Sequence, residues 1–204
     1  MRGLYAITPD VASTDVLARM VAQALEGGIA LLQYRNKVAD PALRREQAQA
    51  LLRLTRPKRV PLIINDDAAL AGQIDADGAH VGRDDGEVAD ARRLLPGKLL
   101  GASCYASFQA AKEAVAAGAD HVAFGSVFAS GTKPGAIRAP LEIFARARTL
   151  GVPLVAIGGI TLENAPLAIS AGADLLAVIA DVFGAPDIAG RAARYRTLFE
   201  KAPA

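Results

Sequence analysis

The sequence predicts an α/β protein, a (β/α)8 TIM barrel that fills a single domain over residues 1–204. Eight short apolar runs, each suited to a buried strand, alternate with about eight segments of helical period. Glycines stand where three of the helices would end before the next strand, in EGGIA, AGADHVAFG and AGADLLAVI. No linker rich in Pro or Ser divides the chain, so a parallel sheet wrapped by helices is expected, with a doubly wound open sheet as the alternative.

The strands are expected in order along the chain. They should begin near residues 4 (LYAIT), 30 (ALLQYR), 61 (PLIIN), 78 (GAHVG), 98 (LLGAS), 121 (HVAFGS), 153 (PLVAIGG) and 174 (LLAVIA). Helical segments lie between them, and in the first of these Val16, Met20 and Ala24 recur at i, i+4 and i+8, which predicts a buried face. No G-x-G-x-x-G follows the first strand, which weakens a dinucleotide-binding open sheet.

Composition limits the classes of function. The formal net charge is +2, from 23 basic and 21 acidic residues, with no long basic run, so a nucleic-acid partner is not expected. The single Cys104 excludes an intramolecular disulfide framework and a multi-cysteine metal site. No apolar run approaches the roughly 18 residues of a membrane span, and a cytoplasmic location without a membrane partner is the default expectation. A homo-oligomer is compatible with the sequence.

Polar residues gather at the C-terminal ends of the predicted strands, the face on which barrels carry their active sites. If the second strand persists through QYRNK, then Gln33, Arg35 and Lys37 point one way, and Tyr34 and Asn36 point the other. The other strand ends carry Asn65, Asp66, Asp67, Arg83, Asp84, Asp85, Ser103, the SGTK loop of residues 130–133, Gly158, Gly159, Ile179 and Ala180.

These strand ends suggest a metal and an anion. One carboxylate from Asp66 or Asp67 and one from Asp84 or Asp85 would suit Mg²⁺, which takes one or two carboxylates and completes its shell with water and substrate phosphate. Arg35, Lys37 and Lys133 at the same mouth would favour a diphosphate. Each aspartate alone could equally begin a helix, where carboxylates are favoured, and the glycine-containing loops could be ordinary turns.

Other reactive side chains are weaker candidates. His80 and His121 lie within apolar strands without metal-ligand spacing, and Cys104 is expected to pack rather than to react. Ser103 shows no histidine partner in the sequence and is not expected to be a hydrolase nucleophile. Tyr105 would contact a substrate ring or fill the mouth.

Eight motifs, in order and over nearly the full chain, resemble those of thiamine phosphate synthase. They are LYAITPD, LLQYRNK, LIINDDAALA, ADGAHVGRDD, GASCY, VFASGTKPG, AIGGIT and AGADLLAVIA. The resemblance implies a (β/α)8 barrel that joins 4-amino-2-methyl-5-hydroxymethylpyrimidine diphosphate to a thiazole phosphate with Mg²⁺ and releases pyrophosphate.

The resemblance also implies roles for individual residues. The pyrimidine diphosphate would be bound by Gln33, Arg35, Lys37, Asn65, Ser103 and Lys133, of which Arg35, Lys37, Ser103 and Lys133 would take part in catalysis. The metal would be held by Asp66 and Asp85. The thiazole phosphate would be bound by Ser130, Gly131, Thr132, Gly159, Ile179 and Ala180.

Three alternatives stay open beside the synthase: a thiazole tautomerase, a barrel that binds a thiamine precursor without catalysis, and another phosphate-substrate barrel enzyme such as a sugar-phosphate isomerase. The last would need an acid/base pair that the sequence does not show. The related thiazole tautomerases use a histidine in the region where this chain has Tyr105, so its absence favours the synthase. A barrel that binds a thiamine precursor without catalysis would bind the same ligands but release no pyrophosphate. For the synthase, a dissociative substitution is expected, in which cations stabilise the leaving pyrophosphate and no protein nucleophile is needed.

Overall fold

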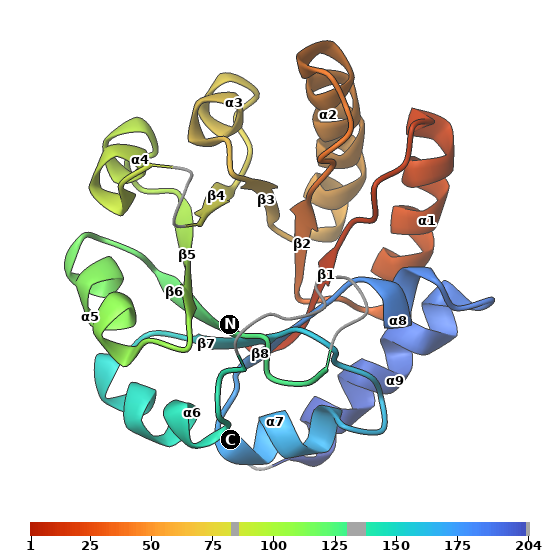
Figure 1. The fold of residues 1–204 in the computed structure, drawn as a ribbon. Coiled ribbons are helices and arrows are strands. Elements are labelled where there is room, and N and C mark those ends of the chain that lie inside the picture. The colour runs from red at the N-terminus through yellow and green to blue at the C-terminus, as the bar shows by residue number, and fades with distance from the viewer. Residues whose placement is uncertain (83–85, 130–137, 203–204) are drawn as a thin grey trace.

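The chain folds into a closed barrel of eight parallel strands, as predicted (Figure 1). The computed structural model describes residues 1–82, 86–129 and 138–202. Each strand pairs with the next in sequence, and β1 closes the ring by pairing with β8 through Gly3–Leu175 and Tyr5–Ala177. The doubly wound open sheet is therefore wrong, because an open sheet would leave two unpaired edges.

The strands begin within about two residues of the predicted positions, because each apolar run is buried on both faces. Their bounds are β1 Gly3–Ile7, β2 Leu31–Tyr34, β3 Leu62–Asn65, β4 Gly78–Val81, β5 Leu99–Tyr105, β6 His121–Gly125, β7 Leu154–Ile157 and β8 Leu175–Val178. All five residues of β1 and all four of β8 are buried.

Helices follow the strands and form the outer ring (Figure 1). They are α1 Thr14–Gly27, α2 Pro41–Lys58, α3 Ala68–Gln73, α4 Val88–Leu94, α5 Phe108–Ala116, α6 Glu142–Ala147, η1 Arg148–Leu150, α7 Ala165–Ala171, α8 Ala180–Phe183 and α9 Ile188–Lys201. None of the helices in the described ranges is long and apolar enough to cross a membrane.

Helix α1 shows why local sequence defines its ends better than its buried face. The Ser13 hydroxyl accepts a hydrogen bond from Val16 N at its start, and Gly28 ends it with a left-handed φ of 86°. The buried face consists of Leu17, Val21, Ala24, Leu25 and Gly27, whereas Val16 is 38% exposed. The predicted face was therefore right in part, because Ala24 is buried and Met20 packs against the core while Val16 does not. Docking against the barrel and α9 decides which stripe is covered.

The barrel interior is filled by alternate residues of the strands. The large ones are Tyr5, Ile7, Leu31, Ile63, Val155 and Leu175, and Ala123 and Ala177 complete the cluster. This packed layer closes the barrel from within, as in other barrels of this kind. A ligand can therefore bind only outside this layer, and in barrels of this kind it binds at the end where the C-terminal ends of the strands lie, which we call the barrel mouth.

Candidate functional site at the barrel mouth

The segment after β2 is held to the segment after β1. The Thr8 hydroxyl accepts a hydrogen bond from Arg35 N and donates one to Arg35 O, both at 2.8 Å. Asp10 Oδ1 lies 3.1 Å from Arg35 Nη1 and accepts a hydrogen bond from the backbone N–H of Lys37 at 2.8 Å. Asp10 thus positions both cations. We did not predict this role, although TPD is itself a polar end of the first strand.

The predicted alternation along QYRNK is confirmed, although β2 ends at Tyr34. Gln33 points into the barrel and donates a hydrogen bond from Nε2 to Tyr5 Oη at 2.8 Å. Tyr34 Oη and Asn36 Nδ2 point outward, and both donate to Gln47 Oε1 on α2, at 2.9 and 3.0 Å. This outward network anchors the segment to a helix and leaves the inward side chains to the mouth.

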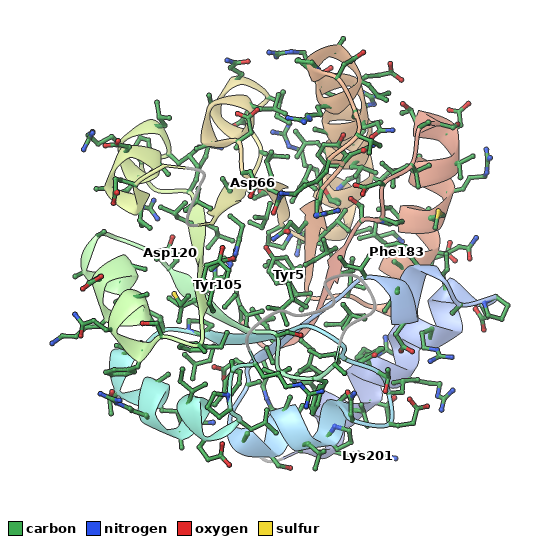
Figure 2. All side chains as sticks on the ribbon, viewed as in Figure 1. Tyr5, Asp66, Tyr105, Asp120, Phe183 and Lys201 are labelled. Atoms are coloured by element: carbon green, nitrogen blue, oxygen red, sulfur yellow. The ribbon has the colours of Figure 1, made fainter. Side chains whose placement is uncertain are left out.

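Lys37 and Asp66, which follow the neighbouring strands β2 and β3, form an ion pair at the mouth. Lys37 Nζ lies 3.2 Å from Asp66 Oδ2, and the Asp66 side chain is 28% exposed. Figure 2 shows Asp66 within the ring of helices, close to the end of β3. Asn65, the last residue of β3, is half-buried beside it. The residue types predicted for a diphosphate and its cation are therefore adjacent on this side of the mouth.

The Asp66–Asp67 ambiguity is resolved by helix capping. Asp67 Oδ1 accepts a hydrogen bond from Leu70 N at 2.7 Å and so begins α3, as the helix-start interpretation expected. Asp66 adopts a left-handed φ of 61°, and its N–H donates to His80 O on β4. Asp66 is therefore the carboxylate of the pair that is available at the mouth. Arg83, Asp84 and Asp85 lie outside the described residues.

Ser103 has a histidine partner, contrary to the sequence-based expectation. His80 Nε2 on β4 lies 2.9 Å from Ser103 Oγ on β5. Sequence could not reveal this pair, because the two residues are 23 positions apart and meet only through strand pairing. Burial lowers the pKa of His80 to about 4, the nearby Asp66 raising it only partly. His80 Nδ1 has no hydrogen-bond partner among the described residues, so the pair lacks the carboxylate of a triad.

The turn after β7 packs against the loop after β6. Val127 N donates to Ile157 O, and Phe128 N donates to Gly158 O, both at 3.0 Å. Gly159 has a φ of 63°, and a Cβ added to it would lie less than 3 Å from Ala129 O. The glycine pair thus allows the loop to approach closely. Ser130, Gly131, Thr132 and Lys133, which continue this loop, lie outside the described residues.

The end of β8 leads directly into α8. Ile179 is half-buried and precedes this short helix, while Ala180, its first residue, is exposed. Asp181 accepts hydrogen bonds from Tyr195 Oη at 2.7 Å and Arg191 Nη1 at 3.0 Å, which ties α8 to α9. By tying α8 to α9, Asp181 holds the neighbouring backbone at Ile179 and Ala180 in place. We did not predict this supporting role.

Two neighbours on β5 differ in their exposure. Cys104 is buried, and burial raises the pKa of its thiol to about 12, which agrees with packing rather than reactivity. Tyr105 is 39% exposed with a φ of 53° and lies within the ring of helices in Figure 2. Tyr105 therefore borders the mouth without sealing it.

The described residues place acidic, basic and hydroxyl groups from neighbouring strands around one mouth. Within the described ranges, no group of three or more His, Cys, Asp or Glu side chains is arranged to hold a metal ion. Asp66 offers a hard oxygen ligand, and any site for Mg²⁺ needs further oxygens from outside these ranges or from the substrate.

Comparison with known proteins agrees with this geometry. The family model described as thiamine monophosphate synthase matches residues 4–182. The thiamine-phosphate synthase of Aromatoleum aromaticum is 57% identical over 202 residues, covering 98% of this chain and 97% of that protein, and the one of Azoarcus sp. is 55% identical over 98% of both. The solved structure of thiamine phosphate pyrophosphorylase from Pyrococcus furiosus is 33% identical with a TM-score of 0.88, over 98% of this chain and 96% of that one. The chain belongs to the thiamine monophosphate synthase family.

Proposed function

We propose that this protein is a thiamine phosphate synthase, a transferase of thiamine biosynthesis. It joins 4-amino-2-methyl-5-hydroxymethylpyrimidine diphosphate to a thiazole phosphate and releases pyrophosphate. The observation that carries the proposal is the charged cluster of Arg35, Lys37, Asp10 and Asp66 at the mouth of a barrel of this family. The cluster supplies cations for a diphosphate beside a carboxylate for a metal ion.

The pyrimidine diphosphate binds on the side of β2, β3 and β5. Gln33 and Asn65 contact the pyrimidine, and Arg35, Lys37, Ser103 and Lys133 contact the diphosphate. This assignment is supported by the two salt bridges that hold Arg35 and Lys37 at the mouth, 3.1 Å from Asp10 and 3.2 Å from Asp66. When the diphosphate enters, Lys37 exchanges part of its contact with Asp66 for a contact with phosphate oxygen.

Asp66 and Asp85 are proposed to hold Mg²⁺. Asp66 fits this role because its carboxylate is free of the capping that occupies Asp67. A bound Mg²⁺ would neutralise charge on the diphosphate oxygens. The proposal makes Lys37 a second neutralising group next to the ion.

The thiazole phosphate binds on the opposite side. Ser130, Gly131, Thr132, Gly159, Ile179 and Ala180 form this subsite, with backbone groups at the end of β8 among the donors. Support comes from the close packing of Gly159 on the loop after β6, which brings two of these segments together. In this assignment the loop contributes residues to both subsites, Ser130, Gly131 and Thr132 to the thiazole phosphate and Lys133 to the diphosphate.

The reaction is a substitution at the pyrimidine methylene carbon. The bond from this carbon to the diphosphate oxygen breaks, its electron pair leaves with pyrophosphate, and the lone pair of the thiazole nitrogen forms the new bond. Arg35, Lys37 and Lys133 stabilise the charge that develops on the leaving group. The protein holds the two rings in line and excludes water from the cation, which needs no protein nucleophile.

Residues 1–204 are proposed to act as a single domain located in the cytoplasm, with small molecules as partners and neither nucleic acid nor membrane. The closure of the ring by β1 and β8 and the packing of α1 on α9 support the single domain.

Pyrophosphate release tests the function. The protein is incubated with both substrates and Mg²⁺, and pyrophosphate is measured with either substrate omitted as the control. We expect release only when both substrates are present. Binding of the substrates without release would favour a non-catalytic precursor-binding barrel, and conversion of the thiazole phosphate alone would favour a tautomerase.

A further inference from the structure

The two histidines of the chain lie together inside the barrel, below the mouth. His80 on β4 and His121 on β6 are 6% and 0% exposed, and their ring centroids are 5.7 Å apart. The reaction proposed above assigns no role to either ring. A buried imidazole lowers the stability of the fold unless its nitrogens form hydrogen bonds, so two such rings side by side suggest a role beyond packing.

Gly101 on β5 lies between the two rings. A Cβ added at residue 101 would lie less than 3 Å from both His80 Nδ1 and His121 Nε2. These two nitrogens therefore face each other across the space that a side chain at residue 101 would fill. Neither has a hydrogen-bond partner within the described ranges, although both are buried. They form no direct hydrogen bond with each other in the structure, but both lie against the same space beside Gly101, where one water could bridge them.

The number of protons on the two rings limits how they can pair. Both rings are buried, and no described carboxylate hydrogen-bonds to them, which favours the neutral form of each ring with one N–H. His121 Nδ1 also has no partner among the described residues. A buried N–H without an acceptor is rarer than an acceptor without a donor, so the His121 proton belongs on Nε2.

We propose that His121 is a positioning residue for Ser103 and acts through His80. His121 Nε2–H donates to His80 Nδ1 through one bridging water. His80 must then carry its proton on Nε2, 2.9 Å from Ser103 Oγ, and donates it to that oxygen. The Ser103 hydroxyl hydrogen is thereby directed to the mouth, where it donates to the anionic substrate.

The reverse order of donors would have the opposite effect. If His80 donated from Nδ1, Ser103 would donate to His80 Nε2 and would present lone pairs to the mouth. Such a serine would repel a diphosphate oxygen rather than bind it. The proton order within the two rings does not depend on the proposed function, and only the last contact, from Ser103 to substrate, rests on it.

Nitrogen NMR of isotope-labelled histidine in the full chain tests the order directly. Only two imidazoles are present, and the spectrum of His121→Gln assigns them. Without substrate near pH 7, we expect both rings to be neutral and protonated on Nε2. A proton on Nδ1 of either ring overturns the proposal. Expected tautomers in a protein that releases no pyrophosphate would contradict the proposed function alone.

A matched pair of variants tests the consequence for catalysis. The amide of His121→Gln can donate from about the position of Nε2, whereas that of His121→Asn reaches only the position of Nδ1. We expect His121→Gln to stay within about twofold of the wild-type kcat and His121→Asn to lose roughly tenfold, the effect of one hydrogen bond. In a Ser103→Ala background the two should be equal. Equal kcat values of the two variants in the Ser103 protein would overturn the proposal.

Discussion

At the scale of single residues, the mouth depends on side chains that hold other side chains. Asp10 binds the Arg35 guanidinium and the Lys37 backbone, while Thr8 fixes Arg35 by two backbone contacts. A flexible cation loses side-chain entropy when it binds an anion, and contacts made in advance reduce that cost. The part of the proposed diphosphate site that Arg35 and the Lys37 backbone form is therefore held in place before substrate arrives.

The Asp66–Asp67 pair allows a controlled test of the proposed metal site. Asp66→Asn removes the charge expected to bind Mg²⁺, and we expect the half-saturating Mg²⁺ concentration for pyrophosphate release to rise at least about tenfold. Asp67→Asn is the control, because Asn caps a helix about as well as Asp. An unchanged Mg²⁺ dependence in Asp66→Asn would remove this residue from the metal site.

At the scale of elements, residues 127–129, the described start of the loop after β6, pack against the turn after β7. Gly158 and Gly159 permit an approach between them that a side chain would prevent. Because the turn after β7 contacts residues 127–129 closely, a small change of its backbone should shift the proposed thiazole phosphate site.

Gly159→Ala tests this coupling, with Gly151→Ala as the control. Both glycines have positive φ, 63° and 72°, but a Cβ at residue 151 meets no atom within 4 Å. Gly151→Ala should lose about 1 kcal/mol of unfolding free energy because a positive φ is unfavourable for alanine. Gly159→Ala should lose more than this, because its Cβ would also lie less than 3 Å from Ala129 O. Only Gly159→Ala should raise KM for the thiazole phosphate, by roughly tenfold or more. Equal steady-state constants in the two variants would contradict the coupling.

Strand positions and the location of the mouth could be predicted from the sequence, because buried parallel strands leave continuous apolar runs and polar ends. The His80–Ser103 contact could not, because it depends on which strands are neighbours and on their register. The buried face of α1 was predicted only in part, since Ala24 lies on it and Val16 does not. Long-range packing decides which face of a helix is buried and which strands are neighbours, and the local periodicity of the sequence does not contain this information.

At the scale of the whole molecule, the barrel interior contains two buried histidines, His80 and His121. His121 contacts the Tyr5 and His80 rings, and both histidine pKa values lie well below the usual value of about 6.5. In the unfolded chain these rings take up protons as the pH falls below that value, while in the folded chain they do not. Acidification between pH 6.5 and pH 5 should therefore favour unfolding.

The size of this effect can be measured by urea unfolding at pH 7 and pH 5. Between pH 7 and pH 5, each histidine should lower the free energy of unfolding by about 2 kcal/mol. The free energy of unfolding of the wild type should therefore be roughly 4 kcal/mol lower at pH 5 than at pH 7. His121→Gln should lose only about half as much, because one titrating ring is gone. The same pH dependence in wild type and variant would contradict a neutral, buried His121.

The whole barrel also explains how one mouth can serve two charged substrates. Parallel closure places the ends of β2 and β3 on one side and those of β6, β7 and β8 on the other (Figure 1). The salt bridges of Arg35 and Lys37 lie on the first side. Two anions can thus be held in one site while their reacting rings approach from different sides.

The measurement that tests the account most directly is the kcat/KM for pyrophosphate release in Lys37→Ala, with Lys112→Ala as a control on the exposed surface of α5. Loss of a cation that stabilises the leaving group should lower kcat/KM about 100-fold in Lys37→Ala, while the control stays at the wild-type value. A wild-type kcat/KM in Lys37→Ala would contradict the role of Lys37 in stabilising the leaving group. The absence of pyrophosphate release by the wild type itself would contradict the proposed function.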